Sequence, residues 1–222
     1  MGLFITMEGP DGSGKSLQMD LLEQDLEQRG FDIVRTREPG GTRISERIRD
    51  LLLDPECAEM DARTEALLYA AARAQHTAER IRPALEAGRI VLCDRFTDSS
   101  LVYQGIGRGL GVEEVAAFNH FATGGLAPDL TILLQIDYEE GLRRKNRQYD
   151  GHLDRMELQQ NDFHHKVHDG FAALQRLYPE RIRMVDGSDS PEEVHKHIME
   201  IVEPLLSGVG MTTDKDERRC RI

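Results

Sequence analysis

The sequence contains no tryptophan and only three cysteines, and aromatic residues make up 5% of its 222 positions. Cys57, Cys93 and Cys220 show no C-x-x-C spacing, which excludes a disulfide framework or a zinc site and predicts reduced thiols. No apolar run approaches the roughly 18–20 residues that cross a bilayer, and the first strand-like run starts too early to leave room for a signal peptide. We therefore expect a soluble, cytoplasmic protein with no membrane partner.

Positive charge is also scarce, because 28 Lys and Arg residues face 40 Asp and Glu residues and leave a net charge of -12. Such a surface repels the phosphate backbone of DNA and RNA, so we expect no nucleic-acid partner. Any phosphate chemistry must depend on local groups of basic side chains. The length suits one α/β domain with a sizeable core.

The most informative stretch is a glycine-rich loop that matches G-x-x-x-x-G-K-[ST]. It consists of Gly9, Pro10, Asp11, Gly12, Ser13, Gly14, Lys15 and Ser16. An apolar run precedes the loop and helical spacing follows it, which is the setting that the pattern requires. Glycines let the backbone N–H groups converge on an anion, and the N-terminus of the following helix adds partial positive charge. Lys15 would then reach the β- and γ-phosphates and the Ser16 hydroxyl would hold Mg²⁺. The alternative is an ordinary glycine turn, but Lys-Ser in register favours a nucleotide-phosphate site.

Short apolar runs alternate with helical patterns along the rest of the chain. Strands are predicted near residues 3–7, 31–34, 90–93, 130–136 and 182–185, and helices at 14–30, 45–53, 61–87, up to 123, from 137, 154–177 and 191–206. This alternation predicts an α/β fold with a five-stranded parallel sheet and helices on both faces. We expect residues 1–206 to form a single domain and residues 207–222 a flexible C-terminal tail.

A phosphate loop alone fits GTPases, ATP-driven motors and small-molecule kinases. No Asn-Lys-x-Asp guanine signature follows a later strand, and a motor would usually need more chain. Arginines and aromatic residues instead gather after the predicted strands, where open α/β sheets bind ligands. These features favour a small-molecule kinase. A kinase for another monophosphate and a nucleotide-binding switch without catalysis remain alternatives.

Five stretches together carry a more specific resemblance. They are residues 4–16, the loop Thr-Arg-Glu-Pro-Gly-Gly-Thr at 36–42, residues 63–73, Asp-Arg-Phe to Tyr-Gln-Gly at 94–105, and Leu-Asp-Arg-Met-Glu at 153–157. Over roughly residues 3–205 the chain resembles the bacterial thymidylate kinases, which are nucleoside monophosphate kinases with a phosphate loop. The resemblance implies phosphoryl transfer from ATP to dTMP with Mg²⁺, and a homodimer.

Tyr69 and Arg73 lie four residues apart, so they share one face of a helix. The resemblance implies that Tyr69 stacks on thymine and that Arg73 contacts its O4 atom; the alternative is a surface Tyr–Arg pair. It also implies that Ser100 and Gln104 contact the pyrimidine edge and that Tyr103 packs under the sugar.

The phosphate and metal contacts are implied in the same way. Asp94 would hold Mg²⁺ directly or through water, and Arg95 would bind the dTMP phosphate with Arg49 and Arg37 beside it, because the guanidinium group pairs two phosphate oxygens. Asp11 would face both the acceptor 3′-hydroxyl and the metal. Glu38 and Pro39 would approach the substrate through a cis peptide bond.

The densest basic cluster comprises Arg143, Arg144, Lys145, Arg147 and Arg155. It is either a solvated helix face or a lid over the nucleotide, which we place at about residues 143–157. Some members of the resembled family carry a catalytic arginine at the position of Gly12. Its absence here predicts that a lid arginine stabilises the transition state, either Arg144 or Arg147.

Overall fold

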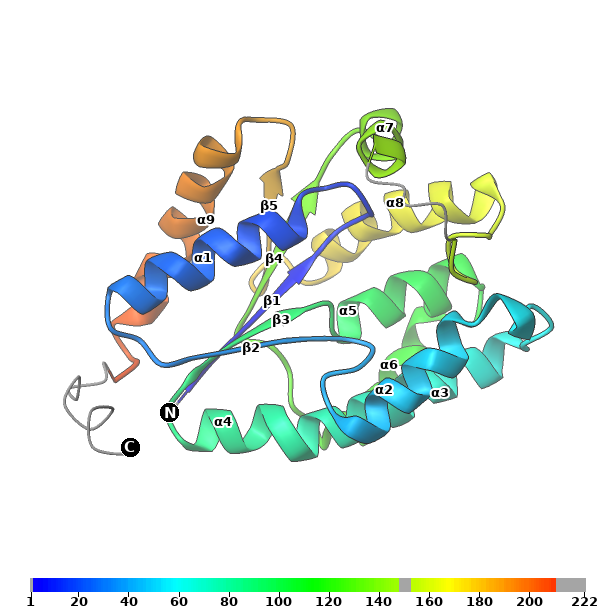
Figure 1. The fold of residues 1–222 in the computed structure, drawn as a ribbon, viewed down its shortest axis with the longest axis horizontal. Coiled ribbons are helices and arrows are strands. Elements are labelled where there is room, and N and C mark those ends of the chain that lie inside the picture. The colour runs from blue at the N-terminus through cyan, green and yellow to red at the C-terminus, as the bar shows by residue number, and fades with distance from the viewer. Residues whose placement is uncertain (1, 148–152, 211–222) are drawn as a thin grey trace, which may run out of the picture.

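A five-stranded parallel sheet forms the centre of the computed structural model, which describes residues 2–147 and 153–210. The strands are β1 (Leu3–Glu8), β2 (Ile33–Arg37), β3 (Ile90–Asp94), β4 (Leu130–Gln135) and β5 (Ile182–Asp186). They lie in the order β2-β3-β1-β4-β5 and every neighbouring pair is parallel (Figure 1). The predicted α/β fold with five parallel strands is confirmed.

Helices connect successive strands. They are α1 (Lys15–Gln28), α2 (Arg43–Leu53), α3 (Ala62–His76), α4 (Arg82–Glu86), α5 (Thr97–Ser100), α6 (Val112–Thr123), α7 (Tyr138–Arg147), α8 (Asn161–Leu177) and α9 (Pro191–Leu206). A 3₁₀ turn, η1, spans Pro55–Cys57, and π-helical turns η2 (Thr77–Ile81) and η3 (Leu101–Gly107) extend α3 and α5. The helix predicted over residues 61–87 is therefore observed as α3, the π-helical turn η2 and α4 in direct succession. No described helix is long and apolar enough to cross a membrane.

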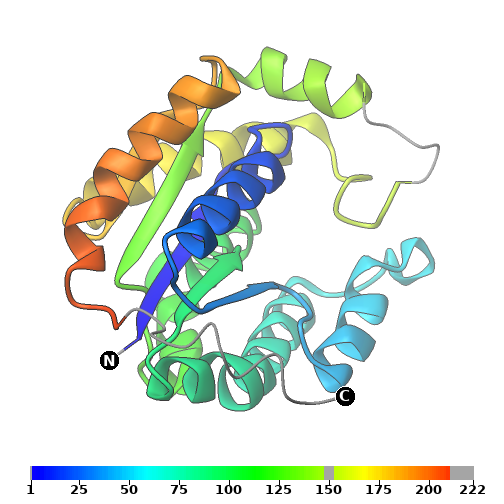
Figure 2. The same cartoon turned by 60° about the vertical axis from the view of Figure 1, so that its left-hand side comes forward.

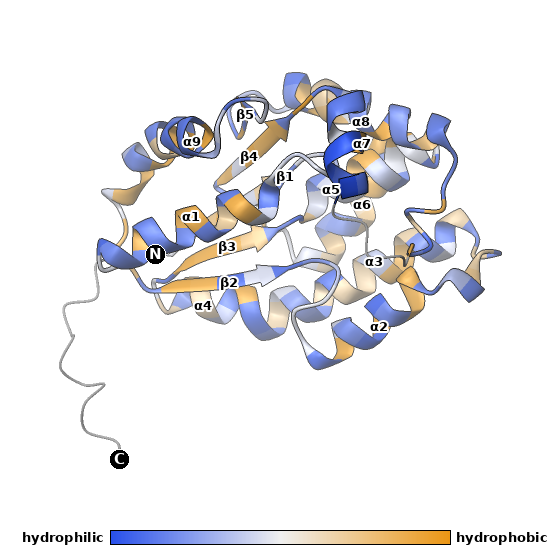
Figure 3. Cartoon of the chain, turned by 45° about the horizontal axis from the view of Figure 1, so that its top comes forward, coloured by the Kyte–Doolittle hydropathy of each residue, from blue (hydrophilic) through white to orange (hydrophobic). Residues whose placement is uncertain are grey.

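Alternating side chains of the strands bury the two faces of the sheet. Leu3, Ile5 and Met7 of β1 pack in one cluster with residues of α1 and α9, whereas Phe4 packs in another with residues of β3, η2 and α4. In Figures 1 and 2, α1 and α9 lie on one side of the sheet and α3, α4, α6 and α8 on the other. Strands β3 and β4 are hydrophobic along most of their length and the outer helical surfaces are largely hydrophilic (Figure 3), as expected for inner strands of a parallel sheet that is covered on both faces.

The parallel arrangement places the carboxyl ends of β1, β3 and β4 at one edge of the sheet. β1 leads into the phosphate loop, β3 ends at Asp94, and β4 leads through Asp137 into α7. Open α/β sheets bind their ligands in the crevice outside these ends. The topology therefore brings together the stretches that the sequence singled out.

The predicted helix start at Asp154 is wrong, because residues 155–158 form an isolated turn and α8 begins only at Asn161. The local capping bonds do form: the Asp154 carboxylate accepts from the N–H groups of Met156 and Glu157, and Glu157 accepts from Asp154 N–H. Arg155, however, is 2% exposed and donates to the Leu52 carbonyl oxygen at 2.7 Å. This anchoring to α2 outweighs the local preference for a helix.

Smaller differences concern element ends. The second strand covers residues 33–37 and not 31–34, and α2 begins at Arg43, where Thr42 accepts from the Ser45 N–H. The end of α9 at Leu206 agrees with the prediction. Part of the proposed lid, residues 148–152, and the tail beyond residue 210 lie outside the described residues. Cys57 and Cys93 are free thiols, whereas Cys220 is not among the described residues.

Candidate active site

The phosphate loop follows β1 and curls around the Lys15 ammonium group. Gly12 and Gly14 have φ angles of +79° and +93°, which only glycine adopts easily, and they turn the backbone into the first residue of α1. Lys15 Nζ donates to the carbonyl oxygens of Gly9 at 3.0 Å and Pro10 at 2.8 Å. Burial and the neighbouring Arg95 lower the pKa of Lys15 to about 8, although Asp11, Asp94 and Glu8 act in the opposite direction. An anionic phosphate in this loop would favour the charged ammonium form.

A cavity of about 800 Å³ opens in front of this loop. One side is formed by α2 and α3 and the other by α7 and residues 153–157, the two flanks that Figure 2 shows on either side of the phosphate loop. Most of the residues expected at a substrate site border it: Asp11, Gly12, Gly14, Lys15, Ser16, Glu38, Pro39, Arg49, Tyr69, Arg73, Asp94, Arg95, Ser100, Tyr103, Gln104, Arg144 and Arg147. The fold thus collects side chains from positions 11 to 147 around one space.

Four expected residues do not border this cavity. Gly9 and Pro10 direct their carbonyl oxygens toward Lys15, and Ser13 is buried with no hydrogen-bond partner for its hydroxyl among the described residues. Arg37 pairs with Glu46 and donates to the Pro39 carbonyl oxygen at 3.1 Å. Arg37 therefore supports the loop that reaches the cavity and does not itself face it.

Arg95 is one of the cations that border the cavity. Its φ of +66° lies in the left-handed region that non-glycine residues rarely adopt, a form of strain common at functional positions. Its guanidinium group contacts Asp11 at 2.6 Å, Gly9 O and Ser99 Oγ at 3.2 Å, and lies 5.3 Å from the centre of the Tyr103 ring. Burial alone would raise the pKa of Asp11, but Arg95, Lys15 and Lys145 hold it below its usual range. Asp11 is therefore a carboxylate in a cationic setting.

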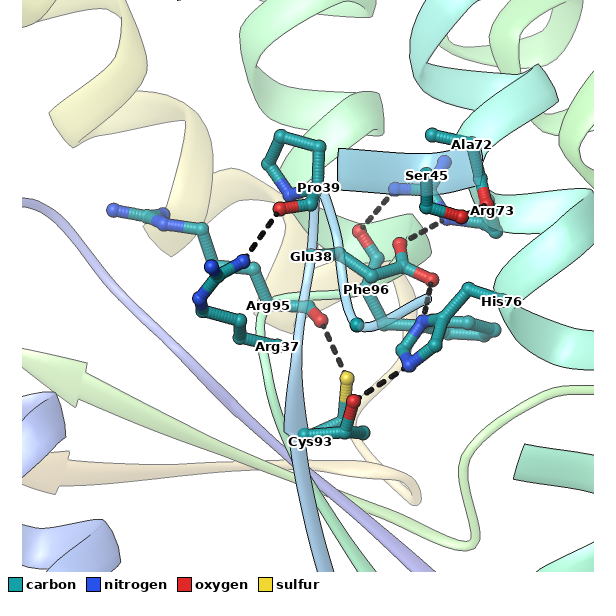
Figure 4. Close-up of polar contacts among 12 residues, drawn as sticks. Arg37, Glu38, Pro39, Ser45, Ala72, Arg73, His76, Cys93, Arg95 and Phe96 are labelled. Atoms are coloured by element: carbon teal, nitrogen blue, oxygen red, sulfur yellow. Dashed lines mark hydrogen bonds and ion pairs between the residues drawn. The ribbon is translucent and has the colours of Figure 1, made fainter. Parts of the chain in front are cut away.

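Arg73 is buried and borders the cavity, and Figure 4 shows it beside Glu38 and Phe96. Its Nε–H donates to Glu38 at 2.7 Å, one terminal nitrogen donates to Ser100 and Asn119, and the other donates to the Phe96 carbonyl oxygen at 3.0 Å. Tyr69, one turn earlier on α3, also borders the cavity. Arg73 is thus not part of a surface Tyr–Arg pair. The Glu38–Pro39 peptide bond is cis, as the resemblance implied.

Gln104 has a second task besides bordering the cavity, because its side chain donates to Glu65 at 2.9 Å. Glu65 is fully buried and also pairs with Arg108 at 2.8 Å and Arg155 at 2.7 Å. Arg155 is therefore a structural residue and not one of the mobile lid cations that the sequence suggested. This cluster links α3 and η3 to residues 153–157.

The oxygen atoms of the site suit a hard cation. Asp94 Oδ1 is buried without a hydrogen-bond partner among the described residues, and Asp94, Ser16 and Asp11 all border the cavity. No group of three or more His, Cys, Asp or Glu side chains in residues 2–147 and 153–210 could hold a metal by itself. Mg²⁺ is commonly held by one or two carboxylates plus substrate phosphates and water, so these residues fit it.

The lid helix α7 rests directly on the phosphate loop. A Cβ atom on Gly12 would lie 2.2 Å from the Gly141 carbonyl oxygen, so any side chain at position 12 would push α7 away. Arg144 donates to Glu140 and to the Gly187 carbonyl oxygen, at 2.9 and 3.0 Å, whereas Arg147 is exposed and has no ion pair with another described residue. Gly12 therefore makes room for the helix that carries Arg144 and Arg147 to the cavity.

Lys145 is a site residue that the sequence did not single out from its basic cluster. It contacts Asp11 at 3.4 Å and Glu157 at 3.1 Å, and so connects the phosphate loop with both parts of the lid. Burial alone would lower the pKa of Lys145, but the two neighbouring acids raise it. Helical spacing could have indicated Lys145, because it lies four residues after Gly141 and so shares the face of α7 that packs against the phosphate loop.

Comparisons with known proteins agree with this geometry. The thymidylate kinase family model matches residues 7–198. The chain is 50% identical over 207 residues to the thymidylate kinase of Geobacillus thermodenitrificans, covering 93% of this chain and 92% of that protein. It is 49% identical over 205 residues to that of Bacillus licheniformis, covering 92% and 97%.

A solved structure agrees as well. The crystal structure of thymidylate kinase from Ehrlichia chaffeensis superposes with a TM-score of 0.73 at 30% identity, covering 91% of this chain and 98% of that one. The matches in sequence and in structure extend over nearly the whole chain and include both flanks of the cavity. This chain belongs to the thymidylate kinase family.

Proposed function

We propose that this protein transfers the γ-phosphoryl group of ATP to dTMP, giving dTDP and ADP. The observation that carries this proposal is a single cavity bordered by the phosphate loop and by Tyr69, Arg73 and Arg95. A donor and an acceptor bound there would lie side by side, as phosphoryl transfer requires. Other monophosphate kinases share the loop but have no need for this set of base-facing side chains.

The donor half is the phosphate loop. Backbone N–H groups of residues 11–16 and the N-terminus of α1 hold the ATP phosphates, and Lys15 exchanges its carbonyl contacts for phosphate oxygens. Ser16, Asp94 and Asp11 would supply oxygens for Mg²⁺, which would neutralise the charge that develops during transfer. Asp11 also faces the acceptor sugar hydroxyl.

The acceptor half lies between α2, α3 and the end of β3. Tyr69 stacks on the base, Arg73, Ser100 and Gln104 contact its polar edge, and Tyr103 packs under the sugar. Arg95 and Arg49 bind the dTMP phosphate. Glu38 and Pro39 form the adjoining wall, supported by Arg37, which does not border the cavity.

The dTMP phosphate oxygen attacks the γ-phosphorus in line, and no general base is needed because this nucleophile is already ionised. The transition state is loose and highly charged, so catalysis consists of positioning and electrostatic stabilisation. Arg95 and a lid arginine, Arg144 or Arg147, supply the positive charge. Closure of the lid, which we assign to about residues 143–157 of a single kinase domain over residues 1–206, excludes competing water.

The test measures phosphate transfer from ATP with Mg²⁺ to dTMP, CMP, UMP and GMP. We expect kcat/KM for dTMP to exceed that for each other acceptor by at least about tenfold, because the side chains of the proposed site suit the thymine base. The variant Lys15→Ala tests the donor site: it should abolish transfer while its circular dichroism spectrum stays that of the wild-type protein. Equal turnover of all four acceptors would refute the dTMP assignment, and near-normal turnover of Lys15→Ala would refute the donor site.

We further propose that the protein acts in the cytoplasm as a homodimer. The resemblance supports the dimer, and two large apolar side chains stand exposed on helices that pack against each other. They are Phe121 of α6, 88% exposed, and Leu67 of α3, 58% exposed. Dimerisation through this face would remove both from water.

A further inference from the structure

A buried chain of hydrogen bonds runs from Arg73 through Glu38 to His76 (Figure 4). Glu38 accepts from Arg73 with one carboxylate oxygen, and its other oxygen lies 2.9 Å from Nδ1 of His76. Nε2 of His76 lies 2.7 Å from the Thr36 hydroxyl. All four side chains are buried, and His76 itself is 0% exposed. Nothing in the proposed phosphoryl transfer requires a histidine at this place.

The direction of each bond in the chain follows from its members. A carboxylate that accepts from a guanidinium group can only accept, so His76 donates its Nδ1–H to Glu38. In the Nδ1–H tautomer, Nε2 accepts from the Thr36 hydroxyl. A Cβ atom on Gly41 would lie 2.6 Å from Nε2 and 2.7 Å from the Thr36 hydroxyl, so the loop backbone covers this bond closely. Both oxygens of Glu38 are thereby held in one orientation.

That orientation determines where Arg73 can donate. Of its five N–H groups, four have acceptors, in Glu38, Ser100, Asn119 and the Phe96 carbonyl oxygen. The fifth N–H has no acceptor in the described part of the chain, and Arg73 borders the cavity. A guanidinium group donates and never accepts, so the ligand atom that meets it must be an acceptor such as a carbonyl oxygen.

We propose that His76 is a positioning residue that, through Glu38, fixes Arg73 so that its fifth N–H selects a pyrimidine with a carbonyl group over one with an amino group. This inference rests on the proposed acceptor site. An amino group at the same ring position would place a donor against a donor and leave both unpaired, which disfavours binding. His76 touches no substrate and acts only through Glu38.

The experiment compares dTMP, dUMP and dCMP as acceptors for the full-length enzyme and two variants. His76→Leu removes the donor to Glu38, and His76→Asn keeps an N–H near the position of Nδ1. We expect His76→Leu to lower the preference for dTMP over dCMP by about tenfold, the scale of one hydrogen bond to a charged group. The effect should fall on KM more than on kcat, because the contact exists before and during transfer. The preference for dTMP over dUMP should not change, since both bases carry the carbonyl group, and His76→Asn should restore the wild-type ratio.

Ser45→Ala is the matched control, because Ser45 is fully buried and donates to the Ala72 carbonyl oxygen at 2.8 Å beside Arg73 without touching Glu38. It should leave the dTMP to dCMP preference unchanged. An equal loss for all three acceptors in His76→Leu would overturn the proposal and leave His76 a purely structural residue. A wild-type enzyme that ignores dTMP would instead refute the proposed function.

A measurement on the wild-type protein covers the case in which His76→Leu does not fold. Nitrogen-15 NMR of the histidine side chains should show His76 as the Nδ1–H tautomer with a protected proton. The Nε2–H tautomer would mean that Glu38 receives no hydrogen bond from His76, and would overturn the proposal without any variant.

Discussion

Glu8, the last residue of β1, is a fully buried carboxyl group directly before the phosphate loop. One of its oxygens accepts from the Phe96 and Ser99 N–H groups and the other contacts the Ser99 hydroxyl at 2.6 Å. Burial and the nearby Asp98 raise the pKa of Glu8 from 4.5 to about 7, against the opposing effects of Arg95, Ser99 and Phe96. Glu8 thus connects the phosphate loop to the segment that carries Arg95 and Ser100.

This raised pKa predicts a pH dependence of stability. Between pH 4.5 and 7 the folded protein retains a proton on Glu8 that the unfolded chain has lost, so this contribution to stability falls as the pH rises through that interval. Glu8→Gln removes the titration and keeps the shape. Relative to wild type, we expect the variant to gain up to about 1.4 kcal/mol of unfolding free energy per pH unit across the interval. Urea unfolding at pH 5, 6, 7 and 8 measures it.

The control for this experiment is Glu113→Gln, the same change at an exposed position on α6. Its difference from wild type should stay constant with pH. A constant difference for Glu8→Gln as well would show that Glu8 titrates as an ordinary carboxyl group.

At the scale of elements, α7 decides how the site is completed. Its backbone lies against Gly12, and its side chains bring Arg144, Lys145 and Arg147 to the cavity. Arg143, on the same helix, is exposed, pairs with Glu140 at 2.7 Å and does not border the cavity. One helix therefore carries the candidate catalytic cations, Arg144 and Arg147, and also Arg143, an arginine that does not border the cavity.

We expect the double variant Arg144→Ala/Arg147→Ala to lose about 10³-fold or more in kcat, the effect of removing an arginine that stabilises phosphoryl transfer. The KM for dTMP should change little, because these side chains act on the transferring group. Single variants assign the larger share to one arginine. Steady-state kinetics of Arg143→Ala provides the comparison and should resemble wild type; a double variant that also resembles wild type would remove the lid arginines from the mechanism.

At the scale of the whole molecule, charge is distributed unevenly. The chain has a net charge of -12, yet Lys15, Arg49, Arg73, Arg95, Arg144, Lys145 and Arg147 border one cavity. These seven cations outnumber the five acids at the cavity, Asp11, Glu38, Asp94, Asp154 and Glu157, so the cavity is locally positive on a molecule that is negative overall.

The proposed dimer is tested at the same scale. Light scattering of the purified protein at micromolar concentration should give twice the 25.1 kDa mass of one chain. Burying Phe121 and Leu67 between two copies would supply part of the driving force. A mass of one chain under these conditions would contradict the homodimer.

Local patterns were sufficient for the fold class and for the position of the phosphate loop between β1 and α1. The phosphate loop and its helix depend on the φ angles of glycines and on residues adjacent in sequence, so residues 9–16 were enough to predict them. The strands were visible because a sheet buried on both faces requires short, wholly apolar runs. These are short-range requirements, and the sequence expresses them directly.

The acceptor half depends on contacts between residues far apart in the chain, which no local pattern reports. Arg155 and Arg144 occur in the same basic cluster, yet one is buried against Glu65 and the other borders the cavity. His76, 38 residues after Glu38, meets it only because α3 packs behind the loop after β2. The sequence by itself predicted a phosphate loop at Gly9–Ser16 and a parallel α/β fold, and the fold is confirmed. Tertiary packing alone decided which charged side chains were buried in pairs and which border the cavity.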